Sequence, residues 1–165
     1  MSKKIKFSKT TIWFSFLICS FLFFCIAEGS EDFATLVEKR LSKNGTVLDL
    51  GGLKIGISGA KKLAKMEELA KVEVLLLQGN KIQYKGMKAL AKSPFVNNIR
   101  QLDLWGNYLG DLGLKALIDS SSFNNLETLK LWKNEIGDDG LELMINSKKF
   151  KSLKTLLLND NFITE

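Results

Sequence analysis

Apolar residues recur along this chain with a fixed period of 27 residues. One column of leucines contains Leu48, Leu75, Leu102, Leu129 and Leu156, and a second contains Leu50, Leu77, Leu104, Leu131 and Leu158. Two polar or small columns keep the same period, at Asn80, Asn107, Asn134 and Asn161 and at Gly59, Gly86, Gly113 and Gly140. A period between about 20 and 50 residues is typical of a stacked array in which each copy packs on its neighbours. Such an array presents an extended surface, which favours binding of another macromolecule.

Within one copy, the spacing of the apolar residues changes from two to three or four, which predicts a strand followed by a helix. In the third copy we expect a short strand at about residues 100–105, with Leu102 and Leu104 facing the core. Asn107 follows this strand, where its side chain can satisfy backbone groups of the loop. A helix should begin near Gly110, with Asp111 as its N-terminal cap.

The pattern L-x-x-L-x-L-x-x-N followed by a glycine-led helix resembles the leucine-rich repeat family, in the long helical subclass typified by ribonuclease inhibitor. The resemblance covers residues 46–165 and implies an α/β right-handed solenoid with parallel strands on the concave face and helices on the convex face. It also implies ligand recognition chiefly by the concave face and no catalytic residues. Two features depart from the pattern: Leu53 stands where the first copy should have asparagine, and the last copy stops at Glu165 before its helix.

The hydrophobic core must be covered at both ends of the array. Residues 28–45 are expected to form an N-terminal capping helix with an apolar face made of Phe33, Leu36, Val37 and Leu41. At the other end, the strand near residues 154–159 would leave an open edge. Two interpretations stay open there: the array is truncated or degenerate, or the edge pairs with itself or with a partner by strand addition.

The first 27 residues have the pattern of a targeting segment. Four lysines precede an apolar run of 16 residues from Ile12 to Ala27. A signal-peptide core usually has about 7 to 15 residues, and a membrane-spanning helix about 20. Small residues around Ala27 indicate cleavage before Glu28. We therefore expect residues 1–27 to be a signal peptide or, if uncleaved, a membrane anchor, and the remainder to be secreted, periplasmic or on the cell surface.

Removal of this segment changes the chemistry expected of the chain. The full chain has 24 basic and 18 acidic residues, and four of the lysines lie in residues 1–27, which leaves a net charge of +2. This balance gives no electrostatic indication of nucleic-acid binding. Both cysteines also lie in the segment, and the chain has no histidine. We therefore expect no enzyme activity, cofactor or metal site.

The residues that alternate with the core leucines should form the exposed face of the sheet, and they place Trp105 beside Trp132. Tryptophan is enriched at binding hot spots, and two exposed neighbours are costly to leave in water. The alternative is that the two rings stack as a cross-strand packing pair. The predicted partner-binding residues are Trp105, Trp132, Leu76, Gln78, Asp103, Lys130 and Asn159.

The charged residues of this face are expected to be mainly structural. Asp103 should pair with Lys130, and the column of Glu73, Arg100, Glu127 and Lys154 alternates in sign, as in a solvated face. Five short strands offer roughly 350 Å² of sheet, less than the ~800 Å² per partner of a standard interface. The face alone would therefore suit a peptide-like or weakly bound partner.

Two functions follow from these patterns. The first is an exported module that recognises a protein or peptide, with no nucleic acid and with membrane contact only through the N-terminal segment if it is uncleaved. The alternative is a structural or self-assembling envelope-associated protein, with or without a membrane anchor, that associates through the C-terminal edge. The sequence does not identify the partner.

Overall fold

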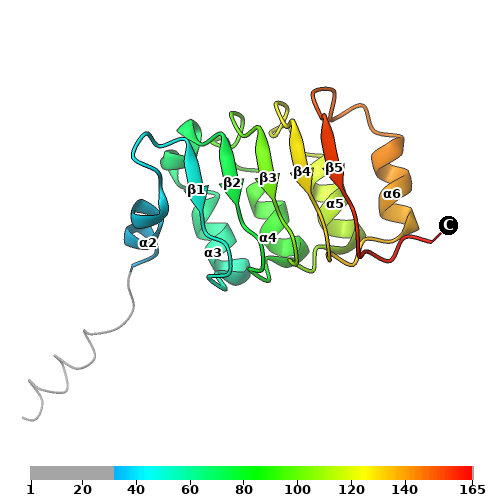
Figure 1. Ribbon diagram of the computed structural model, residues 1–165, viewed down its shortest axis with the longest axis horizontal. Helices are drawn as coiled ribbons and strands as arrows, with labels where there is room; N and C mark the ends of the chain where they lie inside the picture. The colour runs from blue at the N-terminus through cyan, green and yellow to red at the C-terminus, as the bar shows by residue number, and fades with distance from the viewer. Residues whose placement is uncertain (1–31, 165) are drawn as a thin grey trace, which may run out of the picture. The chain divides into compact units, whose positions relative to one another are not determined.

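The computed structural model describes residues 32–164, in which strands and helices alternate along the array (Figure 1). The strands are β1 (Val47–Asp49), β2 (Val74–Leu76), β3 (Gln101–Asp103), β4 (Thr128–Lys130) and β5 (Thr155–Leu157). The helices are α2 (Phe33–Arg40), α3 (Gly56–Leu63), α4 (Gln83–Leu90), α5 (Gly110–Ile118) and α6 (Asp138–Ile145), and η1 (Glu67–Lys71) is a 3₁₀ helix. The strands form one sheet in the order β1-β2-β3-β4-β5. The predicted α/β repeat architecture is confirmed.

Neighbouring strands of the sheet pair in parallel, and each residue of β1 to β4 lies beside the residue 27 positions later. Leu75 pairs with Leu102, and Leu102 pairs with Leu129. Hydrogen bonds between backbones continue past the strands, for example from Gly79 N–H to the Trp105 carbonyl at 2.7 Å. The predicted register is therefore confirmed, and it extends beyond the three-residue strands.

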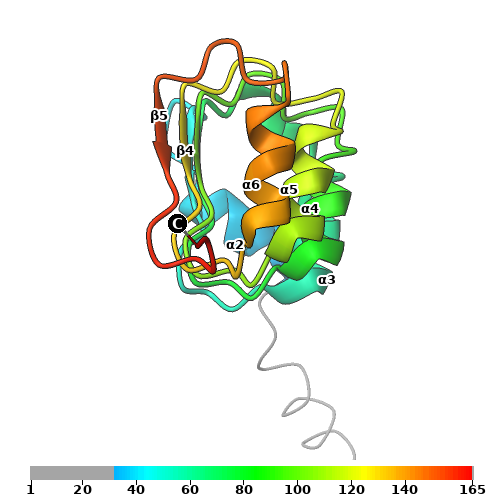
Figure 2. The same cartoon turned by 90° about the vertical axis from the view of Figure 1, so that its right-hand side faces the viewer.

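The array has two layers, the sheet and the helices α3 to α6, with the core between them (Figure 2). Side chains of the two leucine columns point into this core, where Leu102 and Leu104 are fully buried. Helix α5 contributes Leu114 and Leu117 from the opposite layer. The uncovered side of the sheet is called the sheet face below, and the outer side of α3 to α6 is called the helix face.

The asparagine column joins each repeat to its neighbours. The side-chain amide of Asn107 donates hydrogen bonds to the carbonyls of Leu104 and Leu77, each at 2.9 Å. Its Oδ1 accepts from the backbone N–H groups of Asn80 at 3.1 Å and Ile82 at 3.2 Å. Equivalent bonds to the preceding repeat recur along the column. The structural role predicted for these asparagines is therefore confirmed.

The predicted cap of helix α5 is wrong. The capping position is Leu109, and no side chain forms a capping hydrogen bond there. Asp111 instead accepts a hydrogen bond from the backbone N–H of Gly137 in the next repeat, at 2.8 Å. Asp138 binds Thr164 N–H in the same way at 2.8 Å. The backbone of the following repeat lies within reach of these carboxylates, so they tie repeats together.

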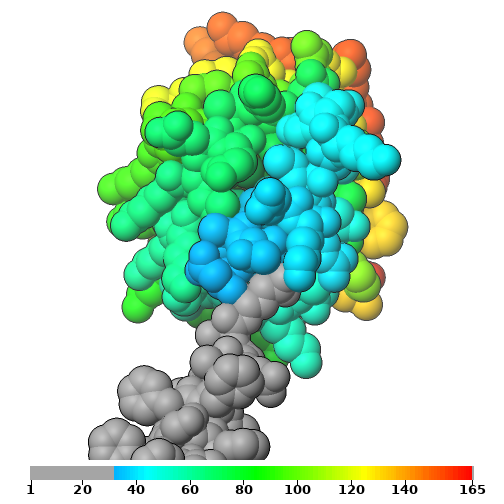
Figure 3. Space-filling model, turned by 90° about the vertical axis from the view of Figure 1, so that its left-hand side faces the viewer, coloured from blue at the N-terminus to red at the C-terminus, as the bar shows by residue number. Residues whose placement is uncertain are grey.

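The two ends of the described array differ. Helix α2, blue in Figure 3, lies against the first repeat and buries Val37 completely. Strand β5 pairs only with β4 among residues 32–164. Leu156 and Leu158 are therefore only partly buried, whereas Leu129 and Leu131 of the preceding repeat are fully buried.

Some predictions concern residues outside the described part of the chain. The expected signal peptide or anchor at residues 1–27 lies there, as do the first residues of the expected capping segment. Between residues 32 and 164, no helix is long and apolar enough to span a membrane.

Candidate functional site

The sheet face carries two large aromatic side chains on adjacent repeats. Trp105 is 42% exposed and Trp132 is 37% exposed. Each follows the end of its strand by two residues, and the register of β3 and β4 places the two positions side by side. This arrangement leaves an apolar patch in water at the centre of the predicted site, as the sequence indicated.

The backbone under both tryptophans is held by the neighbouring repeats. The Trp132 carbonyl accepts hydrogen bonds from Gly106 N–H at 2.9 Å and from the Asn134 amide at 3.0 Å. The Trp105 carbonyl likewise accepts from Gly79 N–H and from the Asn107 amide. Fixed backbones lower the entropy cost of ordering these side chains when a partner binds. The asparagine column thus positions the aromatic pair.

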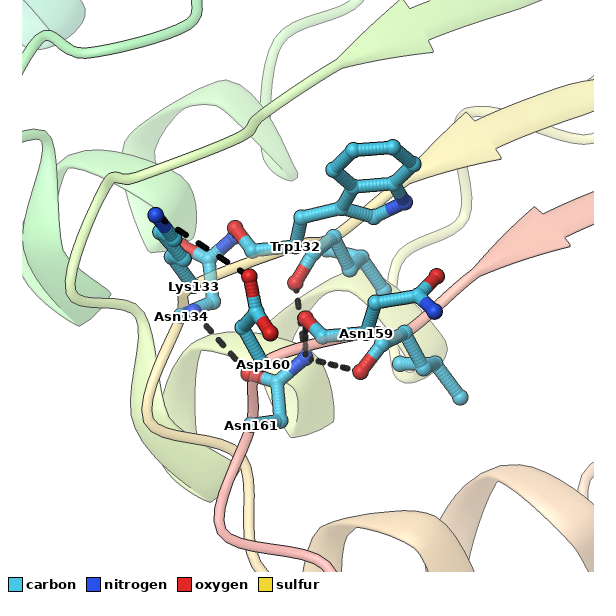
Figure 4. A network of polar contacts seen from close by, with 8 residues as sticks. Trp132, Lys133, Asn134, Asn159, Asp160 and Asn161 are labelled. Carbon is cyan, nitrogen blue, oxygen red and sulfur yellow. Dashed lines mark hydrogen bonds and ion pairs between the residues drawn. The ribbon is translucent and has the colours of Figure 1, made fainter.

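Two charged residues, Lys133 and Asp160, lie close to Trp132 along the chain and across the sheet (Figure 4). The ammonium of Lys133 lies 6.0 Å from the centroid of the Trp105 ring, within cation–π range. It also lies 3.9 Å from the Asp160 carboxylate. Both residues have left-handed backbones, with φ of 51° and 56°. The equivalent position is glycine in the first three repeats, at Gly52, Gly79 and Gly106.

Asp103 was expected to be exposed on the sheet face, and the structure corrects this. The residue is only 9% exposed. One carboxylate oxygen accepts a hydrogen bond from the backbone N–H of Trp105 at 3.2 Å, and the other lies 3.1 Å from the ammonium of Lys130. Asp103 therefore holds the backbone of Trp105 and pairs with the half-buried Lys130. The predicted pair of Asp103 and Lys130 is present.

The remaining predicted residues surround the tryptophans to different degrees. Leu76 is half-buried on β2, and Asn159 is exposed beside Trp132. Gln78 lies flat over Gly51, where any side chain larger than hydrogen would collide with the Gln78 amide. The Gln78 Oε1 atom is buried and has no hydrogen-bond partner among residues 32–164. The predicted set therefore forms one continuous surface, with Asp103 below it.

A charged ladder runs along the margin of the same sheet. Glu127 accepts hydrogen bonds from Arg100 at 2.6 Å and from Lys154 at 2.7 Å. The hydrogen bonds from Lys154 and then Arg100 lower the pKa of Glu127 below its usual value. All three groups reach solvent, so the ladder mainly prevents repulsion between like charges. Glu73, which belongs to the same column, forms no ion pair within the described residues.

Lys133 and Asp160 were not among the predicted site residues. The signal that could have revealed them is the loss of glycine from its column in the fourth and fifth copies. A non-glycine residue in a left-handed backbone is uncommon and is worth examining for function.

The sheet face exposes several kinds of chemical group. Its components are aromatic rings, an ammonium group, amides and aliphatic side chains, which suit contacts with a peptide chain. Between residues 32 and 164 no group of three or more acidic, cysteine or histidine side chains is arranged to hold a metal ion.

Comparison with known families agrees with this architecture. A family described as Leucine Rich repeat matches residues 69–91, 97–117 and 124–144. These segments coincide with the second, third and fourth copies of the 27-residue pattern. The chain matches no curated protein. Domains with such repeats generally bind proteins and are typically non-catalytic. Residues 69–144 are leucine-rich repeats of the ribonuclease-inhibitor-like type.

Proposed function

We propose that this chain is an exported module that binds a protein or peptide through the sheet face around Trp105 and Trp132. The observation that carries the proposal is the exposure of two tryptophans, 42% and 37%, on adjacent and rigidly held backbones. Buried tryptophans at the centre of an interface contribute a large share of binding energy. Lys133 supplies a cation beside them, and Asn159 and Gln78 supply amides.

The size of the face limits the partner. Three-residue strands give a narrow sheet, well below the ~800 Å² per partner of a standard interface. An extended peptide or a protruding loop is the shape that fits such a strip. Tight binding would need further contacts or several modules acting together.

The test begins with a peptide selected from a random library on the wild-type protein. Its affinity is then measured by calorimetry for Trp105→Ala and Trp132→Ala. Each change should cost ~1 to 4 kcal/mol of binding, because hot-spot residues do so, and should shift the unfolding midpoint little. Unchanged affinity would overturn the proposal.

Two controls separate binding from folding. Tyr84→Ala removes another exposed aromatic residue, which is 38% exposed and lies on α4, away from the sheet face. This variant should bind the selected peptide like wild type. Leu104→Ala removes a fully buried side chain and should cost ~2 to 5 kcal/mol of stability. A Trp105→Ala variant as unstable as Leu104→Ala would show that the tryptophans are packing residues.

Export is the second part of the proposal and is supported by the four lysines and the apolar run at residues 12–27. Mass spectrometry of the natively produced protein should find a mature chain that starts at Glu28. An intact Met1 on membrane-bound protein would show the segment to be an anchor.

A second candidate function is self-association through the C-terminal edge. The partial burial of Leu156 and Leu158 at β5, and the 68% exposure of Phe162, favour it. Sedimentation of the full chain over a range of concentrations is the test. A monomer at every concentration would exclude this function.

A further inference from the structure

A groove with a lysine rim lies on the helix face, away from the tryptophans. It lies between the C-terminal ends of α3 and α4 and has a volume of about 450 Å³. Its apolar lining includes Ala64, Ala89 and Phe95. Three lysines line the same groove, namely Lys61, Lys65 and Lys92.

These lysines belong to a larger set that repeats with the period of the chain. Lys61 and Lys65 on the first repeat correspond to Lys88 and Lys92 on the second. All four are exposed, and none forms an ion pair within residues 32–164. Lys61 and Lys88 lie near the C-terminal ends of α3 and α4, and Lys65 and Lys92 follow those ends. Neither helix contains an acidic residue that could pair with them.

The rest of the helix face does not share this charge pattern. On α5 the corresponding residues are Lys115 and Asp119, which pair with one another at 2.9 Å. On α6 the first of these positions is Glu142. The neighbouring groove between α4 and α5 is lined by Asp119 as well as by lysines. The rim of unpaired lysines is therefore a property of α3 and α4 and does not follow from the fold.

Among residues 32–164, the acidic groups of η1 and α6 do not match the lysine rim. Glu67 and Glu68 follow α3 in η1 and form no ion pair with these lysines. On α6 the Asp138 carboxylate already accepts hydrogen bonds from Thr164. If α6 of a second copy docked on the groove, only Asp139 and Glu142 would offer free carboxylates to the four lysines. Half of the lysines would then have no acidic partner.

We propose that the α3–α4 groove binds an acidic segment of another protein, in which carboxylates are interspersed with apolar side chains. The carboxylates would pair with lysines on both sides of the groove, and the apolar side chains would contact Ala64, Ala89 and Phe95. A groove with this lining fits a helical or extended segment better than a flat lipid surface. The module then holds two partners, one on each layer.

The probe for this proposal is a fluorescein-labelled peptide of repeated Glu-Glu-Leu-Leu units, titrated with the full chain by fluorescence anisotropy. The double variant Lys65→Glu, Lys92→Glu should weaken binding by about tenfold or more, and high salt should weaken wild-type binding, because the contacts are ionic. The matched control is Lys54→Glu, Lys81→Glu, which makes the same charge change in the same two repeats, in the loops after β1 and β2. It should alter the affinity by less than about twofold, because Lys54 and Lys81 precede α3 and α4, at the helix ends opposite the groove, and salt screens exposed charges. The thermal unfolding midpoint verifies that both variants fold.

Three results would overturn the proposal. The first is an absence of peptide binding, and the second is an equal loss in both double variants, which would show a response to net charge alone. The third is a double variant Lys65→Glu, Lys92→Glu that loses binding to phosphatidylglycerol vesicles but keeps the wild-type affinity for the peptide. A peptide of glutamate alone should bind more weakly than the Glu-Leu peptide, and equal binding would contradict the role of the apolar lining. Trp105→Ala with Trp132→Ala should not change the affinity for the Glu-Leu peptide. The proposals for the α3–α4 groove and for the sheet face can therefore be contradicted independently.

Discussion

The ammonium nitrogen of Lys133 lies 6.0 Å from the centroid of the Trp105 ring, which belongs to the preceding repeat. The lysine has a φ of 51°, in a column where the first three repeats have glycine. A side chain in the left-handed region costs about 1 to 2 kcal/mol. The chain therefore tolerates local strain at the position that places a cation beside the aromatic pair.

Replacement of Lys133 by glycine should separate this strain from recognition. Lys133→Gly should leave the free energy of unfolding unchanged or raise it by up to about 1 kcal/mol, because relief of strain exceeds the entropy cost of glycine. Affinity for a peptide bound on the sheet face should fall, because the cation beside Trp105 is lost. Denaturant titration and calorimetry on the same preparation measure the two effects.

Lys81 offers a matched control for this change. It is also an exposed lysine with a left-handed backbone, with φ of 56°, and it belongs to the loop after β2. Lys81→Gly should have a similar effect on stability and none on peptide affinity. Equal losses of affinity in the two variants would mean that Lys133 acts only through net charge.

The asparagine column should contribute strongly to stability. Asn107→Ala would leave the backbone N–H groups of Asn80 and Ile82 without their acceptor. The carbonyls of Leu77 and Leu104 would lose one of their two amide donors. Each buried unpaired group costs about 1 to 3 kcal/mol, so the total loss should reach about 2 kcal/mol or more. Chemical denaturation measures it. Asn98→Ala, which removes one exposed hydrogen bond to the Ala70 carbonyl, should cost less than about 1 kcal/mol. Similar losses in the two variants would contradict the difference in burial.

The register of the sheet could be predicted because a strict period leaves only one way to stack identical copies. The columns through Leu102 and Asn107 therefore appear in the structure as expected. The partner of Asp111 could not be predicted in this way. A carboxylate at the start of a helix is usually interpreted as a cap, and only the path of the next repeat brings Gly137 N–H within hydrogen-bonding distance of it.

For the candidate site, alternation along the strands predicted which residues point outward but not how deeply each would lie. Asp103 points to the sheet face, yet its short carboxylate reaches Trp105 N–H and Lys130 and is thereby covered. A second set of asparagines, Asn98 and Asn125, binds the carbonyls of the preceding repeat and was not predicted. These contacts depend on loop conformations that the apolar pattern does not specify.

The charged ladder predicts a pH dependence. Hydrogen bonds from Lys154 and Arg100 lower the pKa of Glu127 in the folded state below the usual 4.5. The stabilisation from this group is therefore present above that value and is lost as the pH falls through the lower folded pKa. The unfolding midpoints of wild type and Glu127→Gln should differ near neutral pH and converge under strongly acidic conditions. Glu73→Gln, in the same column and without an ion pair in the described array, is the control. A difference between wild type and Glu127→Gln that persists in acid would show that packing, and not charge, is responsible.

The bond between Asp111 and Gly137 predicts a local effect at the junction of the third and fourth repeats. Asp111→Ala removes the acceptor that lies 2.8 Å from the Gly137 N–H, and it should cost about 1 to 2 kcal/mol. Hydrogen exchange should speed up at Gly137 and in the first turn of α6, because the start of this helix loses its link to α5. Asp139→Ala is the control: it removes an exposed carboxylate in that same turn, which forms no ion pair within residues 32–164. It should leave the exchange of Gly137 close to that of wild type. Faster exchange in the Asp139 variant alone would show that the helix dipole, and not the bond between repeats, holds the start of α6 in place.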